Sequence, residues 1–172
     1  SVPQMATTIW QHPDFTPEKL HGLKLYVTGG APNPKAQVER FARAGIRFSD
    51  GFGMSETCSN FAMPVLDVER LIEKAGSCGQ PLLTVETRIV DDEGRDVAQG
   101  VTGELWIRGP SVTKGYWNQP ELTAKAFEGD WFKTGDAATM DADGFYYLVD
   151  RKKDMYISGG ENVYPAEVEA VL

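Results

Sequence analysis

The first part of the chain alternates between strand-like and helix-like hydrophobic patterns. Residues 23–27 form a short β-prone run that leads into glycines, and residues 34–44 carry apolar side chains at helical spacing. Gly45 ends the helical pattern, and residues 46–48 alternate like a second strand. The order strand, turn, helix, strand predicts a βαβ-type piece of a parallel sheet.

From about residue 78 the pattern changes to a period of two. Residues 85–90 and 103–109 alternate between apolar and polar positions, and residues 145–149 follow a turn rich in Asp and Gly. Short strands separated by such turns predict a small, strongly bent antiparallel sheet or barrel. We therefore expect an α/β part followed by a β-rich part.

Composition and charge exclude several classes of protein. The chain has 172 residues and a formal net charge of −8, which disfavours a nucleic-acid surface because phosphate contacts need clustered Lys and Arg. No apolar stretch approaches the roughly 20 residues of a transmembrane helix, and no leader-like segment opens the sequence, so we expect a cytoplasmic protein. Cys58 and Cys78 have neither disulfide-framework nor metal-ligand spacing.

Both ends of the chain look like cuts through a longer protein. The sequence begins at Ser1 without an initiator methionine, and it stops at Leu172 inside an amphipathic helix that Pro165 begins. A helix of about two turns is marginal in water. We therefore expect an internal fragment.

The functional signal comes from four segments whose order and spacing matter more than any one of them. Asp50–Thr57 reads Asp-Gly-Phe-Gly-Met-Ser-Glu-Thr and follows the second predicted strand as a Gly-rich loop. The other three are residues 103–109 with 115–117, residues 131–136, and residues 150–169. Together they resemble the core motifs of the adenylate-forming superfamily, which includes acyl- and aryl-CoA synthetases, luciferases and peptide-synthetase adenylation domains. Gly29–Pro32 resembles a further loop of this family.

The resemblance implies a parent enzyme of the acyl-CoA synthetase type. In that reaction a carboxylate attacks the α-phosphate of ATP to give an acyl-adenylate and pyrophosphate, and the thiol of coenzyme A then displaces AMP. The implied parts are the end of the large-domain α/β subdomain (1–77), a β-rich subdomain (78–150), and a hinge with the truncated start of the small C-terminal domain (151–172). Asp150 is the implied hinge residue.

The resemblance also implies roles for individual residues. Phe52 stacks on adenine, where the family usually has Tyr; Ser55 donates a hydrogen bond to the α-phosphate; and Glu56 holds Mg²⁺. Ser55 and Glu56 are thus the expected catalytic residues, and Glu56 is the expected metal ligand. The other expected cofactor-binding residues are Gly30, Ala31, Asp50, Gly51, Gly53, Asp136, Arg151, Gly159 and Gly160.

Four of these assignments have distinct reasons. The carboxylate of Asp136 matches the 2′- and 3′-hydroxyls of ribose, and Arg151 reaches the ribose or the phosphates. Gly159 and Gly160 line the passage for the pantetheine of coenzyme A. We expect residues 103–109 and 115–117 to be structural and assign them no chemistry.

Parts of the expected machinery are absent from the sequence. The family's phosphate loop with its lysine belongs upstream of Ser1, and the catalytic lysine of the small domain belongs beyond Leu172. We therefore expect this stretch by itself to be inactive. Two alternatives stay open: a carrier-protein-loading adenylation domain or fatty acyl-AMP ligase, and a non-catalytic β-rich interaction module. The sequence indicates neither the acid nor the oligomeric state.

Overall fold

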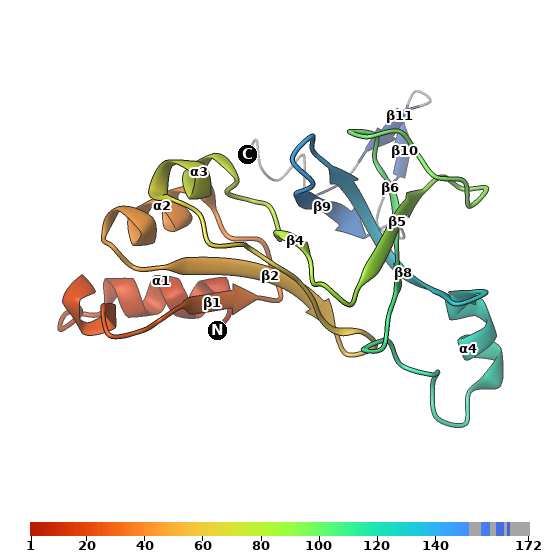
Figure 1. Ribbon diagram of the computed structural model, residues 1–172, viewed down its shortest axis with the longest axis horizontal. Helices are drawn as coiled ribbons and strands as arrows, with labels where there is room; N and C mark the ends of the chain where they lie inside the picture. The colour runs from red at the N-terminus through yellow and green to blue at the C-terminus, as the bar shows by residue number, and fades with distance from the viewer. Residues whose placement is uncertain (152–155, 159–160, 164, 166–172) are drawn as a thin grey trace. The chain divides into compact units, whose positions relative to one another are not determined.

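The chain forms two compact units, residues 1–82 and residues 83–172 (Figure 1). The computed structural model describes residues 1–151, 156–158, 161–163 and 165. Within the described residues, none of the helices combines the length and the apolar character that crossing a membrane requires.

The first unit contains a mixed four-stranded sheet in the order β1-β2-β3-β4. β1 and β2 are parallel, whereas β3 runs antiparallel to both β2 and β4. The helix α2 lies between β1 and β2 in the chain, so the predicted βαβ-type piece is confirmed. The strands are β1 (Tyr26–Gly29), β2 (Phe48–Met54), β3 (Cys58–Ala62) and β4 (Gln80–Pro81).

An aromatic cluster forms the core beneath the helices of this unit. The Phe41 ring from α2 is fully buried, and its centroid lies 4.9 Å from that of Trp10, 5.1 Å from that of Phe48 and 5.5 Å from that of Tyr26. These rings join α1, α2, β1 and β2 into one hydrophobic core. The helices are α1 (Pro3–Gln11), η1 (Pro17–Leu20), α2 (Lys35–Arg43) and α3 (Val68–Glu73).

The prediction that a Gly-rich loop begins at Asp50, directly after the second strand, is wrong. β2 runs from Phe48 to Met54, so the Asp50–Met54 stretch is strand, and the turn that follows comprises only residues 55–57. The reason is the hairpin with β3, in which Phe52 lies opposite Phe61 and the register shifts after Phe52. A Cβ atom on Gly53 would lie 2.1 Å from the Cys58 carbonyl oxygen, so the glycine lets the two strands approach.

The second unit is built on antiparallel strands in the order β5-β6-β8-β7, with β9 pairing with β8. Leu105 and Ile107 of β6 and Phe132 of β8 are buried in its core. The β6–β8 and β8–β9 pairings each carry a register shift, which bends the sheet. The elements are β5 (Glu86–Val90), β6 (Gly103–Arg108), α4 (Pro120–Ala126), β7 (Phe127–Glu128), β8 (Trp131–Met140), β9 (Tyr146–Arg151), β10 (Tyr156–Ser158) and β11 (Glu161–Val163).

The predicted fold class, an α/β part followed by a bent antiparallel sheet, is confirmed by this architecture. The expected start of a small C-terminal domain lies largely outside the described residues. The predicted boundaries after residues 77 and 150 stay predictions. In the structure, the division into two compact units falls between Leu82 and Leu83.

Candidate nucleotide site

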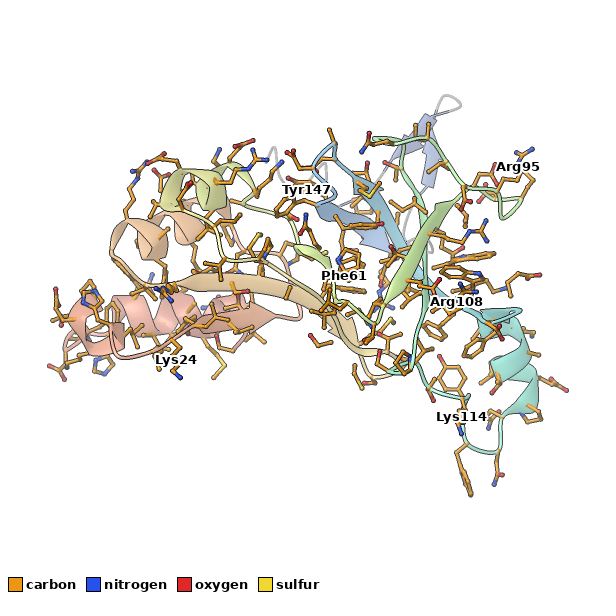
Figure 2. The ribbon with its side chains drawn as sticks, in the orientation of Figure 1. Lys24, Phe61, Arg95, Arg108, Lys114 and Tyr147 are labelled. Atoms are coloured by element: carbon orange, nitrogen blue, oxygen red, sulfur yellow. The ribbon has the colours of Figure 1, made fainter. Side chains whose placement is uncertain are left out.

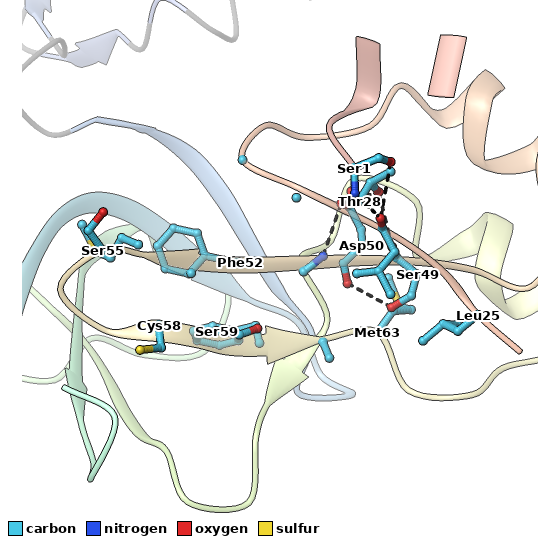
Figure 3. A pocket seen from close by; sticks show the side chains of 18 residues that line it. Ser1, Leu25, Thr28, Ser49, Asp50, Phe52, Ser55, Cys58, Ser59 and Met63 are labelled. Carbon is cyan, nitrogen blue, oxygen red and sulfur yellow. Dashed lines mark hydrogen bonds between the residues drawn. The ribbon is translucent and has the colours of Figure 1, made fainter. Parts of the chain in front are cut away.

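An open cavity of about 620 Å³ lies along the sheet of the first unit (Figure 3). Its walls come from the end of β1, from β2 and from β3. Six of the predicted site residues line it: Gly30, Asp50, Gly51, Phe52, Gly53 and Ser55. Ala31 and Glu56 belong to the same segments but are not among the lining residues.

Phe52 forms part of the cavity wall and keeps part of its ring exposed (Figure 3). Its partner across the hairpin, Phe61 (labelled in Figure 2), is fully buried, with ring centroids 5.9 Å apart and an angle of 58° between the rings. Phe61 therefore supports Phe52 from the core, while Phe52 offers an aromatic surface to the cavity. That arrangement suits stacking on a base.

The turn from β2 to β3 carries Ser55 and Glu56. Thr57 is fully buried and its N–H donates to the Met54 carbonyl oxygen at 3.1 Å, which anchors the turn. Ser55 is exposed in the cavity wall, and Glu56 is half-buried. The described residues contain no group of three or more metal-ligating side chains. A Mg²⁺ ion at Glu56 would take its other ligands from phosphate oxygens and water, as Mg²⁺ at nucleotides commonly does.

The carboxylate of Asp50 is buried and bonded to the protein. It accepts hydrogen bonds from Thr28 Oγ1 at 3.1 Å, from the Asn33 N–H at 3.2 Å and from the Gly51 N–H at 3.3 Å. Burial raises the pKa of Asp50, and the hydrogen bonds from Asn33 and Thr28 oppose that rise. Asp50 thus joins β2 to the turn that follows β1.

Asp136 and Arg151 form an ion pair in the second unit. They lie opposite each other on β8 and β9, with Arg151 Nε 3.1 Å from Asp136 Oδ1. The Asp136 side chain is only 9% exposed, whereas that of Arg151 is 55% exposed. Burial raises the pKa of Asp136; the positive charge of Arg151 opposes this rise, and the negative charge of Glu104 adds to it.

One oxygen of Asp136 has no hydrogen-bond partner among the described residues. Oδ2 is buried and accepts no hydrogen bond from any described residue. Buried polar atoms without partners are rare in native proteins, because each costs the free energy of its lost hydration. A ligand hydroxyl that donates to Oδ2 would remove this cost.

Two residues that sequence reasoning missed hold Asp136 in place. Thr134 Oγ1 donates to the Leu105 carbonyl oxygen at 2.7 Å and accepts from the Asp136 N–H at 3.1 Å. Glu104 Oε1 accepts from the Gly135 N–H at 3.3 Å. Glu104 lies in residues 103–109, which we expected to be structural only. The sequence marked Glu104 only by its position inside a motif. That position did not indicate a contact with Gly135, which lies 31 residues further along the chain.

The predicted site residues thus fall into three groups. Those of segments 29–32 and 50–57 belong to the first unit, and six of them line one cavity. Asp136 and Arg151 belong to the second unit and pair with each other. Gly159 and Gly160 lie outside the described residues. The individual roles stay predictions.

Several known proteins resemble this chain over nearly its whole length. Feruloyl-CoA synthase of an Amycolatopsis species is 44% identical over 99% of this chain and 34% of that protein. O-succinylbenzoate coenzyme A synthetase (MenE) from Bacillus subtilis, solved in complex with AMP, matches with a TM-score of 0.88 and 36% identity, over 100% of this chain and 34% of MenE. MenE has also been solved with ATP and magnesium ion. The amide bond synthetase McbA from Marinactinospora thermotolerans matches with a TM-score of 0.90 and 34% identity, over 98% of this chain and 34% of McbA.

The chain therefore spans about a third of the length of these relatives. The family model described as AMP-binding enzyme matches residues 1–117, which contain the whole cavity and the strands that hold Asp50, Phe52 and Glu104. The family resemblance drawn from the motifs is confirmed. This chain belongs to the AMP-binding enzyme family.

Proposed function

We propose that this chain is part of an ATP-dependent acid–thiol ligase that forms an acyl-adenylate and then an acyl-CoA thioester. The observation that carries the proposal is the buried, unpartnered Oδ2 of Asp136 beside Arg151 among the described residues. A carboxylate held in this state is suited to bind the vicinal hydroxyls of ribose, because it accepts two hydrogen bonds side by side. The names of two relatives, feruloyl-CoA synthase and O-succinylbenzoate coenzyme A synthetase, support the thiol acceptor.

The residues of this chain contribute binding and positioning. Phe52 stacks on adenine, Asp136 binds the ribose, and the Ser55 hydroxyl donates to the α-phosphate. Glu56 supplies one oxygen to the Mg²⁺ that neutralises the phosphates. Catalysis of this kind comes mainly from alignment and from neutralising charge, so loss of one contact weakens the reaction without abolishing it.

The partners of the proposed enzyme are a small carboxylic acid, ATP and coenzyme A, which are cytoplasmic metabolites. The net charge of −8 supports the absence of a nucleic-acid partner. Membership of an enzyme family speaks against a non-catalytic interaction module. The likeness to McbA favours one second candidate, an enzyme that forms the same adenylate and passes the acyl group to an amine.

A two-stage assay of the full-length protein tests the proposal. In the first stage, aryl and aliphatic acids are supplied with ATP and Mg²⁺, and we expect acid-dependent release of pyrophosphate. In the second stage either coenzyme A or a primary amine is added. We expect coenzyme A to cause AMP release and thioester formation, and we expect the amine to give no product. Amide formation without thioester would favour the second candidate. Absence of both pyrophosphate release and AMP binding, across both classes of acid, would contradict both.

A further inference from the structure

A chain of buried polar side chains lies behind the cavity of the first unit. Gln37 Nε2 donates to Asn33 Oδ1 at 2.6 Å, and Asn33 Nδ2 donates to Thr28 Oγ1 at 2.7 Å. Thr28 Oγ1 in turn donates to Asp50 Oδ1 at 3.1 Å. The exposed fraction is 8% or less for each of Gln37, Asn33, Thr28 and Asp50. We name these four residues the Asn33 network.

The hydrogen bonds of the Asn33 network all point the same way. Each donor lies on the side of Gln37 and each acceptor on the side of Asp50, so the dipoles are aligned toward one carboxylate. Aligned hydrogen bonds polarise and strengthen one another in a low-dielectric interior. At the far end Gln37 is held by α1, because Thr7 Oγ1 donates to Gln37 Oε1 at 2.7 Å and Gln37 Nε2 donates to the Pro3 carbonyl oxygen at 3.1 Å.

Asn33 is the centre of the network. Its side chain makes the bonds to Thr28 and Gln37, and its backbone N–H donates to Asp50 Oδ2 at 3.2 Å. Thr28 lies in β1, the turn at residues 30–32 follows this strand, and Asn33 comes directly after the turn, so the bond between Thr28 and Asn33 closes the base of the turn. Gly30, inside the turn, has a φ of +87° that only glycine adopts readily.

The network reaches the cavity through only some of its members. Thr28 and Asp50 line the cavity with Gly29 and Gly30 (Figure 3), whereas Asn33 and Gln37 do not. Asn33 therefore acts on any ligand of the cavity indirectly, by holding the turn and the Asp50 carboxylate.

We propose that Asn33 is a positioning residue for nucleotide binding, which fixes the Gly30–Pro32 turn and the Asp50 carboxylate in the arrangement that faces the cavity. This inference rests on the proposed function, because it takes the ligand of the cavity to be the nucleotide. Gln37 supports Asn33 from α2. The resemblance to the family gives Gly30 and Ala31 a contact with the ligand, and the Asn33 network provides the rigidity that such a contact needs.

The test replaces Asn33 in the full-length protein with a side chain of similar size that forms no hydrogen bond, Asn33→Leu. We expect the dissociation constant of AMP and the KM for ATP to rise about tenfold, as the loss of one or two positioning hydrogen bonds predicts. The variant kcat at saturating ATP stays within about threefold of the native value, because Asn33 does not touch the reacting atoms. Gln37→Leu gives a smaller change in the same direction and carries the test if Asn33→Leu does not fold.

Val38→Ala is the matched control. Val38 lies on the same helix α2, is buried and is not a member of the network, so its truncation lowers the melting temperature without loosening the turn. We expect AMP affinity in Val38→Ala to stay within about twofold of the native protein. Hydrogen exchange at the backbone amide of residue 33, which donates to Asp50 Oδ2, should accelerate in Asn33→Leu and not in Val38→Ala.

The possible failures are distinguishable. If the native full-length protein binds neither AMP nor ATP, the proposed function fails. If it binds AMP, but Asn33→Leu and Gln37→Leu bind as tightly as Val38→Ala, the positioning role of Asn33 fails and the network is structural only. Unchanged exchange at the backbone amide of residue 33 in Asn33→Leu would contradict the fixing of the turn, whatever the affinity.

Discussion

Asp50 and Asp136 show how two buried aspartates acquire different tasks. Burial raises the pKa of both carboxyl groups. Asp50 accepts three hydrogen bonds from its own unit, so its charge is used to hold neighbouring segments together. Asp136 has an ion pair on one oxygen and nothing on the other among the described residues. We therefore propose Asp136, rather than Asp50, as the aspartate that binds a ligand.

Replacing Asp136 with Asn should separate binding from stability. We expect Asp136→Asn in the full-length protein to weaken AMP binding about a hundredfold, because the charged acceptor becomes neutral and one of its two oxygens is replaced by an NH₂ group that cannot accept a hydrogen bond from ribose. At pH 7 the same variant should be at least as stable as the native protein. The measurements are AMP titration by calorimetry and the free energy of unfolding in urea. Asp130→Asn makes the same change of charge at an exposed position and should alter neither the affinity for AMP nor the free energy of unfolding.

The difference in the free energy of unfolding between Asp136→Asn and the native protein should increase with pH. Because the folded pKa of Asp136 is raised above its ordinary value of 3.8, the folded protein holds this proton to higher pH than the unfolded chain does. The native free energy of unfolding therefore falls as pH rises from 3.8 through the folded pKa, and Asp136→Asn lacks this fall. The higher free energy of unfolding of Asp136→Asn, relative to the native protein, should be present at pH 7 and vanish below pH 3.8. A gain that grows on acidification would contradict this assignment.

At the scale of elements, the hairpin of β2 and β3 carries the motif that sequence reasoning placed in a loop. Its glycines are explained by the distance between strands: a Cβ atom on Gly51 would lie 2.8 Å from the Phe61 carbonyl oxygen, and one on Gly53 would lie 2.1 Å from that of Cys58. The small residues thus serve sheet packing first. Their pairing places Phe52 beside Phe61, so the hairpin also presents the aromatic ring to the cavity.

Gly53→Ala should therefore destabilise the first unit. We expect a loss of about 2 kcal/mol or more in the free energy of unfolding, because a methyl group in contact with a carbonyl oxygen forces the strands apart. Gly22→Ala is the control, since nothing lies within 4 Å of a Cβ atom there. Denaturant unfolding followed by circular dichroism measures both. Equal stability of the two variants would show that β2 and β3 do not pair as described.

At the scale of the whole molecule, the chain consists of two units, each with its own hydrophobic core. The first is centred on the aromatic cluster around Phe41, and the second on Leu105, Ile107 and Phe132. The connection between them runs through Leu82 and Leu83, and Leu83 is fully exposed. An exposed leucine outside helices and strands is a good substrate for a protease that cuts beside large apolar residues.

Limited proteolysis tests this division. In the full-length protein, thermolysin should cut first between Leu82 and Leu83 among the described residues, and give one piece that ends at Leu82 and another that begins at Leu83. Mass spectrometry of the early digest identifies the site. Leu83→Asp should slow that cut and leave other cleavages unchanged. A first cut within β1–β3 or within β5–β9 would contradict the assignment of two stable units.

Elements whose limits depend on local signals were predicted closely. Residues 34–44 were predicted as a helix and α2 spans Lys35–Arg43, and Gly45 follows it with a φ of +76°. The predicted strand at 103–109 is β6 at Gly103–Arg108. The error at residues 50–54 has a physical cause: glycines lower the strand propensity of a segment, and the pairing with β3 overrides that propensity.

By itself, the sequence determined the two types of sheet, their order along the chain, and the motifs that indicate the family, because periodicity and motif spacing are local properties. The tertiary structure decided which side chains meet. Asn33 bonds to Asp50 across 17 residues, Thr134 bonds to Leu105 across 29, and Glu104 bonds to Gly135 across 31. Such contacts depend on how strands pair and where helices pack, and no local pattern encodes them.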